Sequence, residues 1–292
     1  MDEKLYIEQI IKEIYPNQSI KILAEGGMSF AFEVGDNIVR IPRNEIAKQD
    51  YRKEEKILTY LKDTITTTVI PNLEIIETPF FHIVHKKLIG LHWEGNTYNK
   101  LSEKAKNSLA NDCACFFSEL HLIDITGIKN NLPQIKVINQ DVEDYLNVYL
   151  SVNEIEAILK HLEILYELPN NVLLHNDFYP PNFFVDTNYR LKSVIDFARA
   201  CYGDFNFEFR KILSYEEGEQ DFWQRIVQFY EDMTHREIDK ETMKTIDVYN
   251  YMDFLSYFAK HYKIEKGKIR VLNRWNDHIV YVKNKIRELK WI

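Results

Sequence analysis

Apolar residues near the start of the chain follow first a helical and then a strand-like period. Residues 2–15 carry apolar side chains at near-helical spacing, and Tyr15-Pro16-Asn17 ends the pattern. The stretches SIKILAE, FAFEV and NIVRIP are rich in β-branched and aromatic residues, and the turn-forming Gly26-Gly27 and Gly35-Asp36-Asn37 separate them. The pattern predicts one leading helix and a three-stranded antiparallel meander.

A second helix is predicted from Asn44, a residue suited to cap a helix N-terminus, to about Lys62. Its spacing places six residues on one expected buried face: Ile46, Tyr51, Glu54, Ile57, Leu58 and Leu61. Two further strands, LEIIET and FFHIVHKK, follow and complete an expected five-stranded sheet with one main helix.

Beyond Gly90 the pattern changes to long helical stretches with brief strands between them. Residues 102–123 and 142–168 are helical in period, as is the chain after Arg210. VLLHND, NFFVD and LKSVIDF are short and apolar, and the turn residues 186–188 are predicted to join the last two into a hairpin. The sequence therefore predicts an α+β protein, whose character changes near residues 86–90 from antiparallel sheet to mostly helix.

Composition and charge narrow the classes of protein and partner. At 45% hydrophobic and 28% charged residues, the 292-residue chain has the composition of a globular protein. No apolar run approaches the roughly 20 residues that cross a bilayer, and the acidic N-terminus does not resemble a secretory signal, so we expect a cytoplasmic protein with no membrane partner. The net charge of -8 argues against a nucleic-acid partner and suits a cationic ligand. The three cysteines are expected to be small buried residues.

The segment HNDFYPPN, residues 175–182, gathers side chains that could do chemistry. Asp177 and Asn182 precede the strand NFFVD, and Asp196 ends the strand that returns after the turn. Singly, each is an ordinary loop residue. If the two strands pair, however, Asn182 and Asp196 come close together and offer the oxygen ligands that Mg²⁺ prefers, which leaves Asp177 free to receive a proton.

This segment resembles the catalytic loop and metal-binding Asp of kinase-like enzymes, in the variant used by the aminoglycoside phosphotransferase family. Residues 117–121 followed by Ile125, and KLSEKAK before them, resemble a helix of the branch that acts on the 2″-hydroxyl. Asp177 and Asn182 keep the spacing found in protein kinases, whereas Asn176 and Ala198 depart toward the small-molecule kinases. The resemblance implies a bilobal protein-kinase-like fold, with a nucleotide-binding lobe in residues 1–87 and a catalytic, acceptor-binding lobe in residues 88–292.

The resemblance also implies which residues bind the phosphates. Residues 24–29 look like the loop that covers them, with donors from the backbone, including Gly27, and from the Ser29 hydroxyl. Arg40 stands where the family usually has Lys and would hold the α- and β-phosphates. Its expected carboxylate partner is Glu54, with Glu55 as the alternative.

The purine and the acceptor involve other segments. Lys86 and Leu88 resemble the hinge whose backbone binds the purine. Residues 203–209 resemble an Asp-Pro-x-x-Asp segment of the family, without the Pro and with Glu for the second Asp, which implies acceptor contacts from Asp204 and Glu208. Glu216 and Glu217 could line a pocket for a polycation, and a solvated helix start is an equal alternative.

The activity implied by the resemblance is transfer of the γ-phosphoryl group of ATP or GTP to a small-molecule hydroxyl, with Mg²⁺ as cofactor and Asp177 as the base. A cationic acceptor, an aminoglycoside antibiotic, is expected first. Two alternatives stay open: a kinase for a macrolide, choline, homoserine or a sugar, and a pseudokinase that binds nucleotide as a regulatory module. A monomer is the default expectation.

Overall fold

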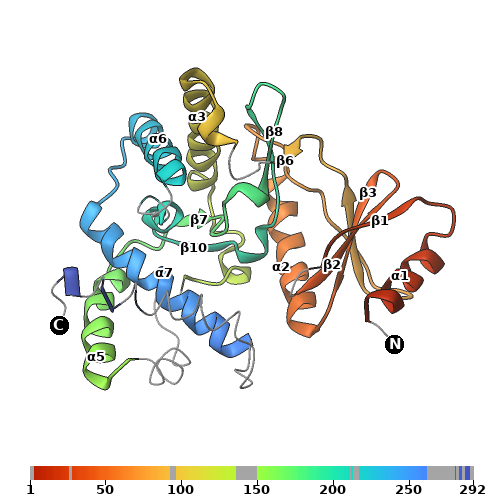
Figure 1. Cartoon of the computed structure of the whole chain (residues 1–292), viewed down its shortest axis with the longest axis horizontal. Coiled ribbons are helices and arrows are strands. Elements are labelled where there is room, and N and C mark those ends of the chain that lie inside the picture. Colours follow the sequence, from red (N-terminus) through yellow and green to blue (C-terminus); the bar gives the residue numbers. More distant parts are fainter. Residues whose placement is uncertain are drawn as a thin grey trace. The chain divides into compact units, whose positions relative to one another are not determined.

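A computed structural model describes residues 3–25, 28–92, 97–135, 150–210, 212, 217–261, 280, 283–284 and 287–289 (Figure 1). The chain divides into two compact units, which we describe separately. The first comprises Met1–Pro133 and His175–Cys201, and the second comprises Gln134–Leu174 and Tyr202–Ile292. These units are defined by contacts within the chain, and the predicted lobe boundary at residues 87 and 88 stays a prediction.

The first unit contains the predicted five-stranded antiparallel sheet, in the order β1-β2-β3-β5-β4. Its strands are β1 (Ile20–Glu25), β2 (Ser29–Val34), β3 (Asn37–Pro42), β4 (Glu74–Ile76) and β5 (His82–Lys86). The turn between β2 and β3 uses Gly35 at φ +57°, where an added Cβ would lie 2.4 Å from Gln18 Oε1. Glycine therefore suits the positive φ of this turn, whereas the end of the Gln18 side chain could move to make room for a Cβ.

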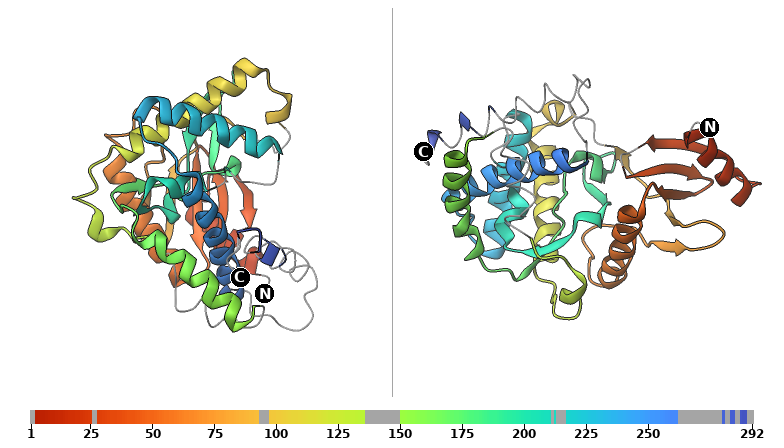
Figure 2. Two further views of the ribbon diagram at one scale, coloured as in Figure 1. Left: turned by 90° about the vertical axis from the view of Figure 1, so that its left-hand side faces the viewer. Right: turned by 90° about the horizontal axis from the view of Figure 1, so that it is seen from below.

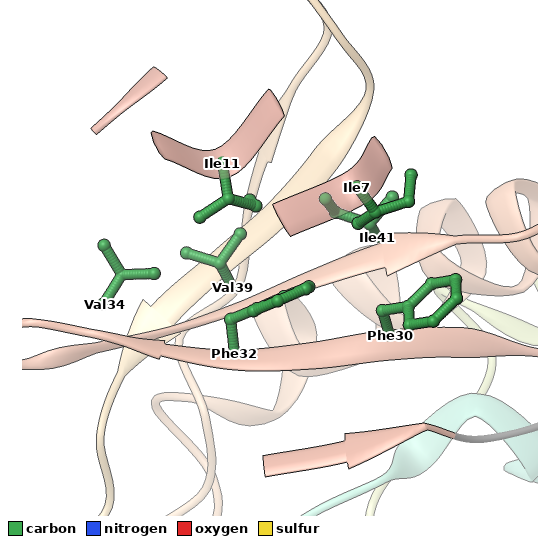
Figure 3. Close-up of a cluster of buried hydrophobic side chains, with 7 residues drawn as sticks. All are labelled: Ile7, Ile11, Phe30, Phe32, Val34, Val39 and Ile41. Carbon is green, nitrogen blue, oxygen red and sulfur yellow. The ribbon is translucent and has the colours of Figure 1, made fainter. Parts of the chain in front are cut away.

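Helix α1 (Glu3–Ile14) lies against one face of this sheet (Figure 3). Cross-strand pairs place Phe30 opposite Ile41 and Phe32 opposite Val39, so their side chains share that face. The resulting buried cluster contains Ile7, Ile11, Phe30, Phe32, Val34, Val39 and Ile41. Because side chains alternate along a strand, Arg40, between Val39 and Ile41, belongs to the opposite face.

Helix α2 (Glu45–Leu61) begins where the sequence predicts, because Asn44 Oδ1 accepts a hydrogen bond from the Ala47 amide at 2.9 Å. Its buried residues are Ala47, Tyr51, Glu54, Ile57, Leu58 and Leu61. The expectation for Ile46 is wrong, since its side chain is 53% exposed. Ala47, one position later, occupies the buried stripe instead, because it lies one helical turn before Tyr51.

The rest of the first unit contains helix α3 (Glu103–His121) and a small sheet of β6 (Leu91–His92), β8 (Phe183–Val185) and β9 (Leu191–Val194). Short 3-10 helices occupy Tyr98–Lys100, Lys129–Asn131, Pro180–Asn182 and Phe197–Arg199. Cys113 in α3 is buried, but Cys115 is only half-buried, which corrects the expectation for that residue. Residues two apart on a helix face different directions, so the two thiols cannot share one environment.

The second unit is mainly helical, with α5 (Val152–Leu162), α6 (Glu217–Thr234) and α7 (Lys240–His261). Strands β7 (Val172–Leu174) and β10 (Cys201–Gly203) pair, and 3-10 helices occupy Glu163–Tyr166 and Phe205–Phe209. Figure 2 shows these elements from two further sides. Its core is built on Trp223, Ile226, Tyr230, Phe207 and Phe209, all almost fully buried.

The predicted α+β class and antiparallel sheet are confirmed by these elements. In the part of the chain that the structure describes, no helix is both long enough and apolar enough to cross a membrane.

Candidate functional site

The loop that begins at His175 follows β7 and is organised by the His175 ring, which is fully buried. The ring Nε2 donates to the Ile195 carbonyl at 3.0 Å, and Nδ1 accepts the Asp177 amide at 3.2 Å. One neutral tautomer satisfies both bonds. The ring also packs on Phe197 with 4.5 Å between centroids. This histidine therefore holds the loop in shape.

Asp177 and Asn182 meet at the two ends of the loop. Asn182 Nδ2 donates to the Asp177 carbonyl at 2.9 Å and to Asp177 Oδ2 at 3.2 Å. Asn182 is buried as the last residue of the 3-10 helix Pro180–Asn182. The amide of Asn182 thus fixes the Asp177 carboxylate, which keeps partial exposure.

The predicted hairpin brings Asp196 to the same place. Phe183 pairs with Val194, and the Ile195 amide donates to the Asn182 carbonyl at 2.9 Å. The turn is closed by Asp186, whose Oδ1 accepts the amides of Asn188 and Arg190 at 2.7 and 3.0 Å. Asp196 follows at φ +66°, in the left-handed region that Asp tolerates better than most residues.

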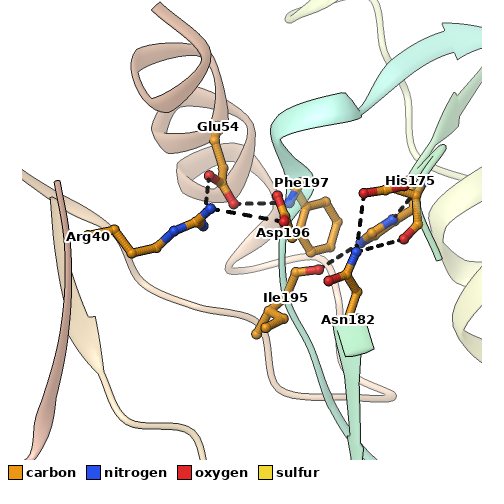
Figure 4. Close-up of polar contacts among 8 residues, drawn as sticks. Arg40, Glu54, His175, Asn182, Ile195, Asp196 and Phe197 are labelled. Carbon is orange, nitrogen blue, oxygen red and sulfur yellow. Dashed lines mark hydrogen bonds and ion pairs between the residues drawn. The ribbon is translucent and has the colours of Figure 1, made fainter. Parts of the chain in front are cut away.

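Arg40, Glu54 and Asp196 form a charged cluster with the Phe197 amide (Figure 4). Arg40 Nη1 lies 3.8 Å from Glu54 Oε2, and Arg40 Nη2 lies 4.0 Å from Asp196 Oδ2. Glu54 Oε1 accepts the Phe197 amide at 3.0 Å. Helix α2 is thereby joined to both β3 and the segment after β9.

Electrostatics in this cluster are set first by burial. Glu54 is 1% exposed, and desolvation raises its pKa to about 7, although Arg40 opposes the shift and Asp196 adds to it. Burial lowers the pKa of Arg40, but Tyr51, Glu54 and Asp196 together raise it above the ordinary value. Arg40 therefore stays protonated and supplies a permanent positive charge.

A divalent metal ion fits the donor set of this site. The Asn182 amide nitrogen is turned to Asp177, so the amide oxygen remains for a cation, and Asp196 adds a carboxylate that is 30% exposed. Among the described residues, no cluster of three or more His, Cys, Asp or Glu side chains could hold a metal ion. Phosphate oxygens would have to complete the ligand set, which is typical of Mg²⁺ bound with a nucleotide.

The predicted phosphate loop is described only in part. Gly27 lies outside the described residues, and Ser29 is buried at the start of β2. Sequence reasoning missed Arg43, whose amide donates to the Met28 carbonyl at 2.9 Å and whose guanidinium lies 2.9 Å from Glu25 and 4.1 Å from the centre of the Phe30 ring. The sequence feature that could have indicated these contacts is the basic residue directly after Pro42.

The other predicted nucleotide-binding residues lie at the C-terminal end of β5 and just after it. Lys86 is the exposed last residue of β5, and Leu88 is half-buried just after it. The Lys87 amide donates to the Asp36 carbonyl at 2.9 Å, which ties this stretch to the β2–β3 turn. Glu55, the alternative partner of Arg40, is in no ion pair with Arg40, which pairs with Glu54.

The predicted acceptor residues belong to the second unit and are mostly buried. Asp204 is 1% exposed, and its Oδ1 accepts the Asn206 amide and Asn206 Nδ2 at 3.0 and 2.7 Å. Glu208 is 3% exposed. Glu216 lies outside the described residues, and Glu217 is described only as the first residue of α6.

Residues 20–241 match the family model described as "Phosphotransferase enzyme family". The match spans the sheet, the loop at His175 and the hairpin. The chain belongs to this phosphotransferase family. The prediction made from the residues around Asp177, Asn182 and Asp196 is confirmed at the level of the family.

Solved structures share the fold of this phosphotransferase. APH(2")-IIa in complex with gentamicin is 23% identical, with a TM-score of 0.74 and 96% of each chain covered. The GDP complex of an aminoglycoside 2'-phosphotransferase-IIIa mutant is 18% identical, with a TM-score of 0.75 and 98% of each chain covered. Macrolide 2'-phosphotransferase MphH from Brachybacterium faecium is 16% identical, with a TM-score of 0.67, 89% of this chain and 96% of that chain covered. The kinase-like fold expected from the sequence is confirmed.

Proposed function

We propose that this phosphotransferase moves the γ-phosphoryl group of ATP or GTP to a hydroxyl group of a cationic small molecule, with an aminoglycoside as the first candidate. The observation that carries the proposal is the juxtaposition of a partly exposed Asp177 with Asn182, at 3.2 Å, and of Asn182 with the segment that carries Asp196. Phosphoryl transfer needs such an arrangement because most of its catalysis is positioning and charge neutralisation.

Asp177 is proposed as the residue that orients the acceptor hydroxyl and takes its proton. A carboxylate is suited to this task when it is held in one orientation and is still reached by solvent and substrate. The Asn182 amide supplies the orientation, and the His175 ring fixes the loop backbone through the Asp177 amide.

Asn182 and Asp196 are the residues that would hold Mg²⁺, and Arg40 would hold the α- and β-phosphates. When bound, Mg²⁺ supplies neutralisation of the charge that develops on the phosphate oxygens. Glu54 contacts both Arg40 and the Phe197 amide and so holds the two groups near each other. The donor is proposed as a nucleoside triphosphate, since several structures with the same fold are named as complexes with ATP or GDP.

The acceptor is proposed from charge and from the relatives. A net charge of -8 favours a cationic acceptor over an anionic one. Structures of the same fold are named with gentamicin, kanamycin and streptomycin. A macrolide is the second candidate, because macrolide 2'-phosphotransferases share the fold as well.

A release assay for ADP and GDP tests this proposal with Mg²⁺, both donors and a panel of aminoglycosides, macrolides, choline and homoserine. Asp177→Asn is run beside the wild type, and Asp63→Asn, an exposed acid after α2, is the matched control. Turnover on aminoglycosides that Asp177→Asn loses and Asp63→Asn keeps would support the proposal. Turnover only on another acceptor would replace the substrate, and nucleotide binding without any transfer would favour the pseudokinase.

A further inference from the structure

The guanidinium of Arg40 lies over an aromatic ring as well as beside two carboxylates. Its central carbon is 4.8 Å from the centre of the Tyr51 ring. Glu54 and Asp196 flank the same group at 3.8 and 4.0 Å. The Tyr51 ring and the two carboxylates thus lie around the same guanidinium.

The two ion pairs alone do not determine how the guanidinium is turned. Both exceed the 2.7–3.2 Å that is usual for a hydrogen bond from nitrogen to oxygen, so the carboxylates attract Arg40 without fixing its plane. A flat ring does fix a plane, because a guanidinium stacks face to face on it. Lysine has no plane, and its ammonium would gain no fixed orientation from the ring.

Tyr51 is itself rigidly placed. Its side chain is 3% exposed on the buried face of α2, three residues before Glu54, so one helix face presents both the ring and the carboxylate to Arg40. The Tyr51 hydroxyl is shielded from solvent and lies close to both Ser29 and Arg40. The ring and the hydroxyl are therefore both near the guanidinium, and the Tyr51→Phe variant separates their contributions.

We propose that Tyr51 is a positioning residue that fits this site to arginine at position 40. Its ring fixes the guanidinium plane so that the N–H groups at the edges serve Glu54, Asp196 and the nucleotide phosphates together. The inference rests on the proposed function only in that it takes the phosphates of a nucleotide as the ligand of Arg40.

The test is a double-mutant cycle on the dissociation constants of ATP and GTP with Mg²⁺, measured by titration calorimetry. Tyr51→Leu is expected to weaken nucleotide binding by about 5- to 30-fold, the range expected for a partly desolvated cation–π contact. Tyr51→Phe keeps the ring and is expected to restore most of that loss. In the double variant that combines Tyr51→Leu with Arg40→Lys, the loss of nucleotide affinity should be about fivefold smaller than the product of the two single losses.

A control separates positioning from general stability. Arg52 lies 5.0 Å over the ring of Phe81, a buried residue in the same unit but outside the Arg40 cluster. Phe81→Leu should lower the unfolding temperature about as much as Tyr51→Leu and leave nucleotide affinity unchanged. Equal losses of affinity in both variants would overturn the proposal, because they would report on folding alone.

Two further outcomes would overturn the proposal. In the first, the losses of nucleotide affinity in the two single variants simply multiply in the double variant. In the second, Tyr51→Phe binds nucleotide as weakly as Tyr51→Leu, which would show that the hydroxyl, rather than the ring, positions Arg40. A cycle on the free energy of unfolding without nucleotide gives a second readout of the Arg40–Tyr51 contact. Nucleotide binding with intact coupling but no phosphoryl transfer would refute the proposed function and leave this inference standing. Transfer without coupling would refute the inference alone.

Discussion

Asp177 and Asp204 are acidic residues that each follow a short strand, yet their surroundings differ. Asp177 comes after β7, is partly exposed, and accepts the Asn182 amide nitrogen at 3.2 Å. Asp204 comes directly after β10, is 1% exposed, and caps the following 3-10 helix through the Asn206 amide and side chain. A carboxylate open to solvent can exchange a proton, whereas one enclosed by donors stabilises a fold.

An acid after a strand is therefore not by itself a functional signal. Exposure and the number of fixed donors around the carboxylate decide its role, and both depend on the packed structure. The same reasoning bears on Glu208, which is 3% exposed. Acceptor contacts from Asp204 and Glu208 therefore stay predictions of the sequence.

Replacing Asp177 should give the largest effect. Asp177→Asn removes the proposed base but keeps the side-chain shape, so turnover should fall by about 10²- to 10⁴-fold while nucleotide affinity and the unfolding temperature stay near wild type. Steady-state kinetics with calorimetry measure both quantities. Turnover that survives in Asp177→Asn would show that Asp177 is not the base.

Replacing Asp196 should give the next effect. Asp196→Asn keeps a residue suited to the left-handed backbone but removes a charged oxygen ligand, so the Mg²⁺ concentration for half-maximal turnover should rise at least about tenfold. A Mg²⁺ titration at saturating nucleotide measures this. Asp186→Asn, at the other end of the hairpin, is the control and should not change the Mg²⁺ requirement. An unshifted Mg²⁺ titration for Asp196→Asn would argue against the proposed ligand.

Replacing Asp204 should act on stability. Asp204→Ala leaves the buried Asn206 donors without their acceptor, and the free energy of unfolding should fall by about 2 kcal/mol. Urea unfolding measures the change. Unchanged stability combined with a raised KM for the acceptor would instead favour the acceptor-binding role that the sequence predicts.

Glu119 in α3 adds a third kind of acid to the comparison, partly exposed but with every carboxylate oxygen engaged. Its Oε1 accepts the amide and hydroxyl of Thr66 at 2.8 and 2.7 Å, and its Oε2 accepts those of Thr67 at 3.0 and 2.6 Å. Burial opposes ionisation, but these hydrogen bonds outweigh it and lower the pKa of Glu119 below the ordinary 4.5. Glu119→Gln should therefore cost about 1 kcal/mol of stability at neutral pH.

The pH dependence of that cost follows from the direction of the shift. Because the folded-state pKa of Glu119 is depressed, its stabilisation is present above pH 4.5 and is lost as the pH falls through the lower folded-state value. Urea unfolding of wild type and Glu119→Gln should converge below pH 4.5. Glu163→Gln, an exposed acid, is the control, and a constant difference for Glu119→Gln at every pH would contradict this role.

Local patterns explain which parts of the fold could be predicted from the sequence. The sheet of the first unit, the Asn44 cap and the hairpin at Asp186 depend on turn residues and strand periodicity within a few positions. Strand β10 could not be predicted, because it is three residues long and pairs with β7 from a distant part of the sequence.

The residues of the candidate site also differ in whether the sequence alone could predict their place. Asp177, Asn182 and Asp196 could be brought together from spacing and one hairpin. Tyr51 could not be distinguished from a core residue, since an apolar face of a helix looks the same whether it packs on aliphatic side chains or under a guanidinium. The burial of Asp204 could likewise not be predicted from the sequence, because it depends on Asn206 folding around the carboxylate.

The left-handed backbone of Asp196 also shapes what random mutation can do at this position. Among the amino acids that one nucleotide change from an aspartate codon can reach, Asn, Gly and His adopt such a conformation most readily, whereas the β-branched Val is strained there. None of the three tolerated replacements has a carboxylate. Screens that reward folding alone should therefore enrich well-folded proteins with Asn, Gly or His at position 196 that have lost the proposed metal ligand.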